Sequence, residues 1–335
     1  MRKFVSIVFS LMIAGSSASQ AIDLLSNDSV YDQPTRIVGA PTMEGFGHVV
    51  TDRLLSRREA HIITDAAGTA AAFTTFCQSQ DPKIAPVILA ARQMTAIERE
   101  DCALMRQGII AQTEIGLTGI VIAEGLHRKR LALTTTHLFY ALASRVPSDA
   151  KNCTLVPNTS KFWSDIDPSL PRREIAVFGP PDTSGTRKDF LELAMVEGAM
   201  NDPCMKALKA KTPFLFQTAS QDIRNDDTWI DAGDNSHSIV AAIMTMPHAI
   251  GVLEYPNFFP HTDRVAAIPI NGLEPNRKSI SSGGYALTQV LRIYSNTDAL
   301  KKNPDADRFF QEITSERAVG ERGYLVGYGL VPIQK

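Results

Sequence analysis

Features that would point to a nucleic-acid or membrane partner are scarce in this sequence. Aromatic residues make up only 7% of its 335 residues, the formal net charge is -2, and Lys and Arg form no basic patch. Beyond the amino terminus, no apolar run approaches the roughly 20 residues that a membrane-spanning helix needs. The sequence therefore gives no electrostatic support for nucleic-acid binding, and we expect neither a later membrane span nor a disordered region.

Signatures of metal or hydrolytic chemistry are also absent. No two of the four cysteines form a Cys-x-x-Cys pair, and none of the seven His residues lies in a recognisable catalytic or metal motif. Ser184 stands in Thr-Ser-Gly-Thr and not in Gly-x-Ser-x-Gly. We predict no metal, no cofactor and no enzymatic activity. A serine hydrolase using Ser184 is the alternative, because triad partners can lie far apart in sequence.

The first 21 residues have the features of a cleaved export signal. Arg2 and Lys3 precede an apolar run over residues 4–14, and Ser19 and Ala21 are small residues at positions suited to signal peptidase. A membrane anchor is the alternative, but the run is too short for one. No Cys stands directly after the run, so we predict a periplasmic protein without a lipid anchor.

The cysteines all lie beyond this signal. An even number of cysteines in an exported chain favours disulfides. Cys77 lies in one predicted helix and Cys102 in the next, so a bridge between them is the first choice, which leaves Cys153 with Cys204. Buried free thiols are the alternative.

Short β-rich runs alternate with amphipathic segments from residue 36 onward, which is the pattern of an α/β fold. Thr95 and Glu98 predict a capping box for a helix over residues 98–106 that Gly108 ends. A second helix is expected from about Arg187. The predicted strands cover residues 36–38, 61–63, 87–90, 117–122, 174–178, 249–253, 265–270 and 290–294.

The length of the chain suggests two domains. Both ends of the mature chain have strand-helix units, so we predict lobe 1 from residues 22–123 and 250–335 and lobe 2 from residues 124–249. Residues 149–173, rich in Pro, Ser, Asp and Asn, predict a long surface excursion. By analogy, this is the two-lobed plan of a periplasmic binding protein. Each lobe would be a mostly parallel sheet flanked by helices, with the ligand in the cleft between the lobes.

Three loops of small or hydroxylated residues each follow a predicted strand and open a helix, at residues 39–43, 64–69 and 179–186. Helix starts carry unpaired N–H donors and a partial positive charge, so several that converge would bind an oxyanion. Such loops lie beyond the carboxyl ends of strands, where α/β sheets place ligands. Ordinary helix capping is the alternative for any single loop.

Two arginines could supply charge to such a site. Arg92 follows an apolar strand at the same end of the sheet and is the candidate cation, with a surface salt bridge as the alternative. Arg187 directly follows the third loop and could approach the anion or face solvent.

Taken together, these residues resemble the PstS-like periplasmic phosphate-binding proteins of phosphate ABC transporters, over almost the whole mature chain. The first matching stretch has the family's small-residue turn ending in Thr, and the fourth contains its Ser-Gly-Thr. The matching stretches are residues 39–46, 68–73, 90–93, 178–186, 247–251 and 285–287.

The resemblance implies a monomeric receptor that captures inorganic phosphate and delivers it to the membrane permease of an ABC transporter. It also favours the Cys77–Cys102 bridge. Met43 and Gly185 would contribute only backbone N–H groups. The alternative is a binder or sensor of another oxyanion, such as sulfate, phosphonate or tungstate. The implied ligands are Thr42, Met43, Thr69, Arg92, Ser184, Gly185 and Thr186, with Asp182 and Arg187 as further candidates.

The chain departs from the family at three positions. Pro180 stands where some members carry an Arg, and Ala91 where a Ser could donate a hydrogen bond. Arg92 stands where some members place an Asp that accepts the phosphate proton, with Asp182 and Asp65 as possible substitutes. Because a buried acceptor separates hydrogen phosphate from sulfate, the choice between these anions stays open.

Overall fold

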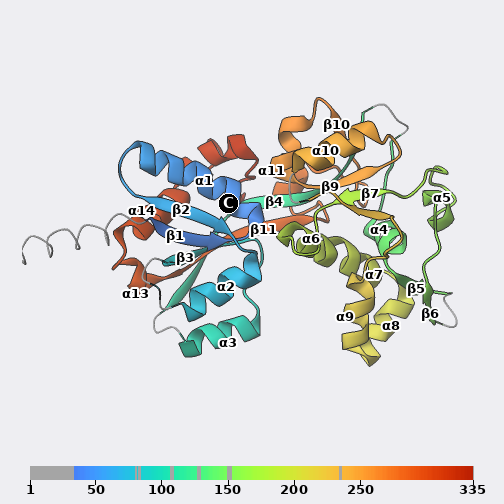
Figure 1. Cartoon of the computed structure of the whole chain (residues 1–335), viewed down its shortest axis with the longest axis horizontal. Coiled ribbons are helices and arrows are strands. Elements are labelled where there is room, and N and C mark those ends of the chain that lie inside the picture. The colour runs from blue at the N-terminus through green and yellow to red at the C-terminus, as the bar shows by residue number, and fades with distance from the viewer. Residues whose placement is uncertain are drawn as a thin grey trace, which may run out of the picture. The chain divides into compact units, whose positions relative to one another are not determined.

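The computed structural model describes residues 34–79, 81, 84–105, 109–126, 130–148, 153–233 and 236–334. Thr35–Lys335 form one compact unit (Figure 1). The predicted signal, residues 1–21, lies outside the described residues. Within the described part of the chain, no helix has the length and apolar character that crossing a membrane requires.

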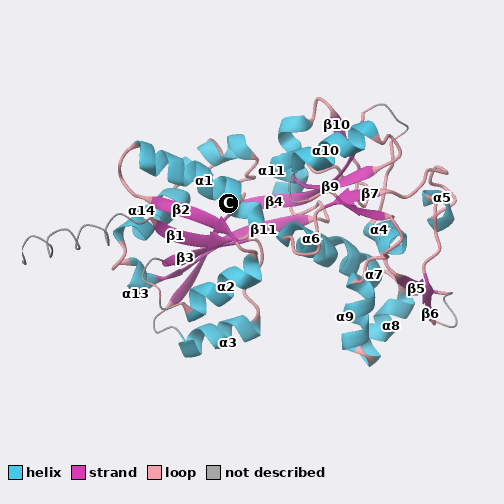
Figure 2. Ribbon diagram, viewed as in Figure 1, coloured by secondary structure: helices cyan, strands magenta, loops and turns pink. Residues whose placement is uncertain are grey.

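The fold is a large sheet with helices packed along it (Figure 2). Its strands pair in the order β2-β1-β3-β11-β4-β9-β7-β8, and β10 also pairs with β4. β5 and β6 form a separate two-stranded sheet. The strands are β1 (Thr35–Gly39), β2 (Ile62–Ala66), β3 (Ile84–Ala90), β4 (Ile110–Gly125), β5 (Arg145–Pro147), β6 (Leu155–Pro157), β7 (Val177–Gly179), β8 (Trp229–Asp231), β9 (Ile250–Glu254), β10 (Val265–Ala267) and β11 (Thr288–Asn296).

Helices connect most of the strands. Three consecutive helical segments, α6, η1 and α7, follow one another without a gap and make one stretch over residues 185–200. The helices are α1 (Pro41–Ser56), α2 (Thr69–Gln78), α3 (Ala96–Met105), α4 (Thr135–Leu142), α5 (Trp163–Ile166), α6 (Gly185–Phe190), η1 (Leu191–Val196), α7 (Glu197–Met200), α8 (Pro203–Lys211), α9 (Pro213–Gln221), α10 (Ser236–Thr245), α11 (Tyr255–Phe258), η2 (Phe259–His261), α12 (Arg277–Ser281), α13 (Thr297–Leu300), α14 (Pro304–Ile313), α15 (Glu316–Val319) and η3 (Tyr324–Tyr328).

The sheet has a first part (β2, β1, β3) and a second part (β9, β7, β8), separated by β11 and β4. Pairing within each part is parallel, because a helical crossover joins successive strands. β11 and β4 run antiparallel to each other, and to β3 and β9 respectively. The predicted α/β fold is therefore confirmed, with the parallel strands gathered at the two sides of β11 and β4.

Separate groups of buried side chains support the two parts. Two clusters, which contain Phe46 and Phe76 respectively, pack against the first part. The largest cluster contains Phe139 and Trp163 and packs against the second part. It also takes in buried residues of β9 and β10 and extends to Leu287. The predicted lobe limits stay a prediction, and this packing favours a return to lobe 1 near residue 288 and not at residue 250.

Most local predictions agree with the structure. All eight predicted strands overlap observed ones. β4 is longer than predicted because its first five residues are not buried and residues 112–114 are polar, which hides its start. The capping box is confirmed: the Glu98 N–H donates to Thr95 Oγ1 at 3.2 Å, and the Thr95 N–H donates to Glu98 Oε2 at 2.9 Å. The short strands β5, β6 and β8 were not predicted, since three residues carry too little pattern.

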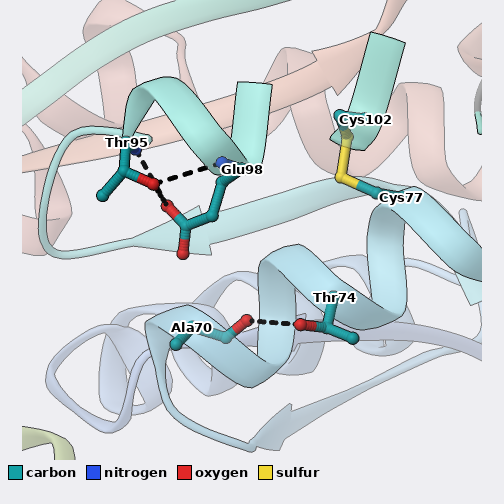
Figure 3. Close-up of a disulfide and its surroundings, with 6 residues drawn as sticks. All are labelled: Ala70, Thr74, Cys77, Thr95, Glu98 and Cys102. Atoms are coloured by element: carbon teal, nitrogen blue, oxygen red, sulfur yellow. Dashed lines mark hydrogen bonds between the residues drawn. A yellow bond between two sulfur atoms is a disulfide. The ribbon is translucent and has the colours of Figure 1, made fainter. Parts of the chain in front are cut away.

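Both predicted disulfides are present. Cys77 of α2 bonds Cys102 of α3, so the two helices are held side by side (Figure 3). Cys153 bonds Cys204 of α8. The second bond ties the predicted surface excursion to a helix; this segment also contains β6 and α5, and its residues 149–152 lie outside the described residues.

Candidate functional site

The loops after β1, β2 and β3 are joined by backbone hydrogen bonds. The Ala40 N–H donates to Leu89 O at 2.8 Å. The Ala67 and Gly68 N–H groups donate to Gly39 O at 3.1 and 3.2 Å. Because these strands are parallel, their carboxyl ends share one edge, and α1 and α2 both begin there. The first two predicted anion-binding loops are therefore neighbours.

The third loop comes from the second part of the sheet and reaches the start of α1. Gly185 opens α6, and a Cβ atom at this position would lie 2.9 Å from Pro41 Cδ at the first residue of α1. That distance is too short for an ordinary contact, so a glycine lets the two helix starts approach. The third predicted loop therefore meets the start of α1, which follows the first predicted loop, although the two are far apart in sequence.

Two of the predicted ligands converge on a carboxylate that the sequence did not single out. Thr42 Oγ1 donates to Glu254 Oε1 at 2.7 Å, and Thr186 Oγ1 donates to the same oxygen at 2.5 Å. Glu254 is the last residue of β9 and is only 5% exposed. We call Thr42, Thr186 and Glu254 the threonine–glutamate junction. A signal for Glu254 was available, since it is a charged residue at the end of an apolar strand, on the ligand side of the sheet.

The other predicted hydroxyl and backbone ligands are buried beside the helix starts. Ser184 precedes α6, and its N–H donates to Pro181 O at 3.0 Å. Thr69 begins α2 directly after Gly68, whose φ of 86° suits a glycine. The Met43 N–H already donates to Ala40 O at 2.9 Å. As anion ligands, these residues stay predictions.

Arg92 forms a local ion pair and does not bond the junction hydroxyls. Its Nη1 and Nη2 donate to the two carboxylate oxygens of Glu98 at 2.9 and 2.7 Å, and its guanidinium lies 5.5 Å from the centre of the Phe73 ring. The hydrogen bond to Glu98 raises the pKa of Arg92, against the opposing effect of burial. Burial would raise the pKa of Glu98, but bonds from Arg92 and Thr95 bring it below the usual value. The salt-bridge alternative describes Arg92 in this structure.

The carboxyl group of Asp189 interacts electrostatically both with Glu254 of the junction and with Arg92. Burial, with a smaller contribution from the charge of Glu254, raises the pKa of Asp189 to about 7, although Gln289 hydrogen-bonds the side chain and Arg92 attracts the charge. Asp189 was not among the predicted residues, although it lies one helical turn after Thr186. This carboxyl group can therefore exchange a proton near neutral pH.

The two further candidates lie away from the junction hydroxyls. The Arg187 guanidinium stacks on the Trp229 ring at 4.0 Å, and Arg187 Nη1 donates to Pro180 O at 3.5 Å. Burial lowers the pKa of Arg187. Asp182 is exposed in the loop before α6. Arg187 thus neither reaches the junction nor faces open solvent.

One cavity borders the junction, and a second lies beside Arg92 and Asp189. The first, of about 380 Å³, is bordered by Thr42 and Glu254 together with the exposed rings of Phe259 and Tyr328. The second, of about 640 Å³, is lined by polar and charged side chains, among them Arg92, Lys188, Asp189 and Gln289. Among the residues that the structure describes, no group of three or more His, Cys, Asp or Glu side chains is placed to hold a metal ion.

Comparison with known proteins gives one family and a consistent set of relatives. A model described as "PBP superfamily domain" matches residues 15–317. The phosphate-binding protein PstS of Staphylococcus saprophyticus is 25% identical over 178 residues, which are 52% of this chain and 46% of the relative. The PstS protein of Staphylococcus aureus is 28% identical over 173 residues, 50% of this chain and 44% of the relative. The chain thus matches about half the length of these curated relatives.

Solved structures are similar over nearly the whole chain. An ABC-type phosphate transport receptor from Vibrio cholerae superposes with a TM-score of 0.60 at 15% identity, covering 90% of this chain and 99% of the other. A possible phosphate binding protein from Planctomyces limnophilus gives a TM-score of 0.59 at 17% identity, covering 90% and 93%. At these identities the similarity concerns the fold.

Proposed function

Because the chain belongs to the PBP superfamily, we propose that it is a non-enzymatic receptor that captures inorganic phosphate and delivers it to the membrane permease of an ABC transporter. The named functions of its relatives support this proposal, since PstS proteins and phosphate transport receptors recur among them. The export features of residues 1–21 are consistent with a periplasmic location.

One observation carries the proposal. The hydroxyls of Thr42 and Thr186 come from helices that follow different parts of the sheet, yet both donate to a single oxygen. A pair of donors that converges on one oxygen can also hold one oxygen of an oxyanion. The N–H groups at the adjoining helix starts and the nearby guanidinium of Arg92 would complete the shell after a local rearrangement.

Binding would draw the two parts of the sheet together, because the ligand shell takes groups from both. In this scheme β1, β2 and β3 supply Thr42, Met43, Thr69 and Arg92. β7 leads into Ser184, Gly185 and Thr186. The two sets would act as lobes that close on the anion, as in other hinged receptors. We further propose that the receptor acts as a monomer.

Two alternatives to phosphate capture are a serine hydrolase that uses Ser184 and a binder of another oxyanion. A hydrolase needs a base within hydrogen-bond reach of the serine hydroxyl. In the described part of the chain, no hydrogen bond joins Ser184 to a His. Another oxyanion, such as sulfate, phosphonate or tungstate, would use the same donors as phosphate, so these ligands must be compared directly.

Titration calorimetry on protein stripped of bound phosphate tests the proposal. We expect heat of binding and a rise in melting temperature with inorganic phosphate, because a ligand that binds only the folded state stabilises it. The absence of both effects with phosphate would refute phosphate capture. Assays with chromogenic phosphate and carboxylate esters should give no turnover, and steady turnover that Ser184→Ala abolishes would establish the hydrolase instead.

A further inference from the structure

The helices α8 and α9 form a hairpin beside the second part of the sheet. α8 ends at Lys211 and α9 begins at Pro213, so Thr212 alone links them, and the two helices pack against each other. In Figure 1 they extend beyond α7, away from the large sheet. We call residues 203–221 the lysine hairpin.

The inner side of the lysine hairpin packs on the largest buried cluster. Met205 and Phe216 belong to that cluster, and Leu208 is partly buried against it. The disulfide between Cys153 and Cys204 adds a covalent tie to the start of α8. The hairpin is therefore a fixed part of the fold.

The turn of the hairpin exposes two large apolar side chains. Every residue from Lys209 to Leu215 is exposed, and Phe214 and Leu215 are 83% and 44% exposed. Phe216, the next residue, is only 1% exposed and already supplies the packing on the inner side. Single exposed apolar residues are common on proteins, but two adjacent ones at a turn form a small apolar surface.

Positive charge accompanies this apolar surface. Lys206, Lys209 and Lys211 are exposed, and no Asp or Glu stands between Asp202 and Asp222. Among the residues that the structure describes, no ion pair is found for these three lysines. They are too few to mark a nucleic-acid patch, and the formal net charge of -2 for the whole chain conceals them.

The carboxylates that flank the hairpin in sequence are engaged elsewhere. Asp202 accepts from the Met205 N–H at 2.9 Å and from the Tyr140 hydroxyl at 2.7 Å. Asp222 accepts from the Ser144 hydroxyl. The charges of the hairpin lysines therefore stay available to an external anionic partner.

Two kinds of partner fit an exposed basic and apolar surface, a protein and a lipid membrane, and the residue types favour lipid. The cores of protein interfaces are depleted in Lys, and their aromatic anchors fill pockets of the partner. At a membrane, a Lys keeps its ammonium group among the headgroups while its stem lies along apolar surface. Exposed apolar side chains enter the headgroup region, and an anionic leaflet attracts each Lys near its surface.

We propose that the lysine hairpin docks on a membrane surface rich in anionic phospholipid, with Phe214 and Leu215 inserted among the headgroups and the three lysines beside lipid phosphates. The hairpin would lie on the membrane without spanning it. This docking goes beyond the proposed function, because it needs no anion at the helix starts. A receptor held at the surface would meet its permease at a higher effective concentration.

Co-sedimentation with vesicles tests the inference. The mature chain, residues 22–335, is used because the apolar run of the predicted signal would itself bind lipid. The vesicles contain phosphatidylcholine alone, or equal parts of phosphatidylcholine and phosphatidylglycerol. At low ionic strength we expect at least about tenfold tighter binding to the anionic vesicles, and loss of that binding in added salt.

Two results on the wild-type protein would overturn the inference. Equal binding to both kinds of vesicle would show that anionic lipid is not recognised. Binding to neither would leave the hairpin as a surface for a protein partner.

A variant of the apolar surface assigns the binding to the hairpin. Phe214→Ser should weaken binding to anionic vesicles at least about fivefold, because a buried ring is lost from the headgroup region. Leu104→Ser is the matched control: Leu104 is also 83% exposed, but it lies on α3, which carries Glu100 and Asp101. Equal losses in both variants, or no loss with Phe214→Ser, would contradict docking through the hairpin.

A variant of the charge gives an independent test. Replacing all three hairpin lysines with Gln should weaken binding to anionic vesicles at least about tenfold. The control makes the same exchange at three exposed lysines outside the hairpin, Lys278, Lys301 and Lys302. If both triple variants lose binding equally, net charge and not the hairpin determines binding, and the inference fails. The exchanged side chains are exposed, so melting temperatures should match wild type.

A fluorescent probe on the hairpin tests insertion directly. In Phe214→Trp, the emission of the new indole should shift to shorter wavelength with anionic vesicles, because Trp favours the boundary between water and lipid. Wild-type protein under the same conditions gives the contribution of Trp163 and Trp229. Unchanged emission from vesicle-bound protein would overturn the insertion of the hairpin.

Discussion

Two carboxylates of this protein hold residues that were predicted to bind an anion, and they do so in different settings. Glu98 binds Arg92, six positions away, and the two side chains are 20% and 35% exposed. Glu254 binds Thr42 and Thr186 across most of the chain and is buried. The first pair is accessible and screened by solvent, so it opens at little cost. The second holds two helix starts together, so its donors are released only against a considerable penalty.

The comparison predicts that the junction hydroxyls matter most for binding. Replacing both threonines, Thr42→Val and Thr186→Val, should weaken phosphate binding about 100-fold, because each hydroxyl makes a hydrogen bond to a charged group. The double variant should also unfold at lower denaturant concentration, since Glu254 stays buried without these two donors. Calorimetry and urea denaturation would measure the two effects.

Thr74→Val is the matched control for that variant. The Thr74 hydroxyl donates to Ala70 O within α2 and lies at the surface (Figure 3). Affinity within threefold of wild type in the double variant would remove the hydroxyls from the site.

Arg92 should contribute less, because an anion must first take it from Glu98. We expect Arg92→Ala to weaken phosphate binding at least about tenfold through loss of a charge-assisted hydrogen bond. Arg36→Ala removes another ion-paired arginine, on β1, and should bind phosphate normally. Equal affinity of the Arg92 variant and wild type would mean that Arg92 serves only its salt bridge.

Asp189 gives a prediction about pH and stability. Its pKa is raised from 3.8 to about 7 in the folded chain, so folding takes up a proton between these values and the protein loses stability as pH rises across that window. Asp189→Asn should remove this dependence and gain about 1–2 kcal/mol over wild type at pH 8, a value reduced from the full shift because the side chain is partly solvated.

Urea denaturation of both proteins at pH 5 and pH 8 would measure the gain at Asp189. Glu197→Gln, on α7, offers a carboxyl group outside the junction as a control. A stability difference between variant and wild type that is the same at both pH values would contradict the assignment.

The smallest effect is expected at Glu98. Glu98→Gln releases Arg92 while a Gln at this position can still complete the capping box with Thr95. Phosphate affinity should rise about two- to fivefold at low ionic strength and return toward wild type in added salt, because the pair is partly open to solvent. Weaker binding would show that Glu98 positions Arg92 for the anion and does not withhold it.

The features that the sequence predicted join residues close together in the chain, whereas the features that it missed join residues far apart. The capping box of Thr95 and Glu98 and the Cys77–Cys102 bond join residues in the same or successive helices, so local pattern was sufficient. The convergence of the first two loops followed from the parallel order of β1, β2 and β3. The approach of the third loop, which follows β7 in the other part of the sheet, did not follow from that order. The place of Glu254 at the end of an apolar strand was visible in the sequence. Its role was missed because its partners lie 212 and 68 positions away, and no local pattern reports that two distant helix starts meet it there.

Arg92 shows a different limit of sequence reasoning. Its place after β3 was predicted correctly, but two roles fitted the same position, an anion ligand and a salt bridge. Only the position of Glu98 on the next helix decides which partner it has in this structure. A sequence gives the charge of a side chain more readily than its partner.

The long strand β4 has a mechanical consequence. It pairs with β11 over residues 110–119, then with β9 over residues 120–124 and with β10 over residues 123–125. Any movement between the two parts of the sheet must therefore twist a continuous hydrogen-bonded ribbon, which resists torsion as an elastic beam does. In deuterium exchange, we expect the amide protons of residues 117–123 to be among the last to exchange, whether or not an anion is bound.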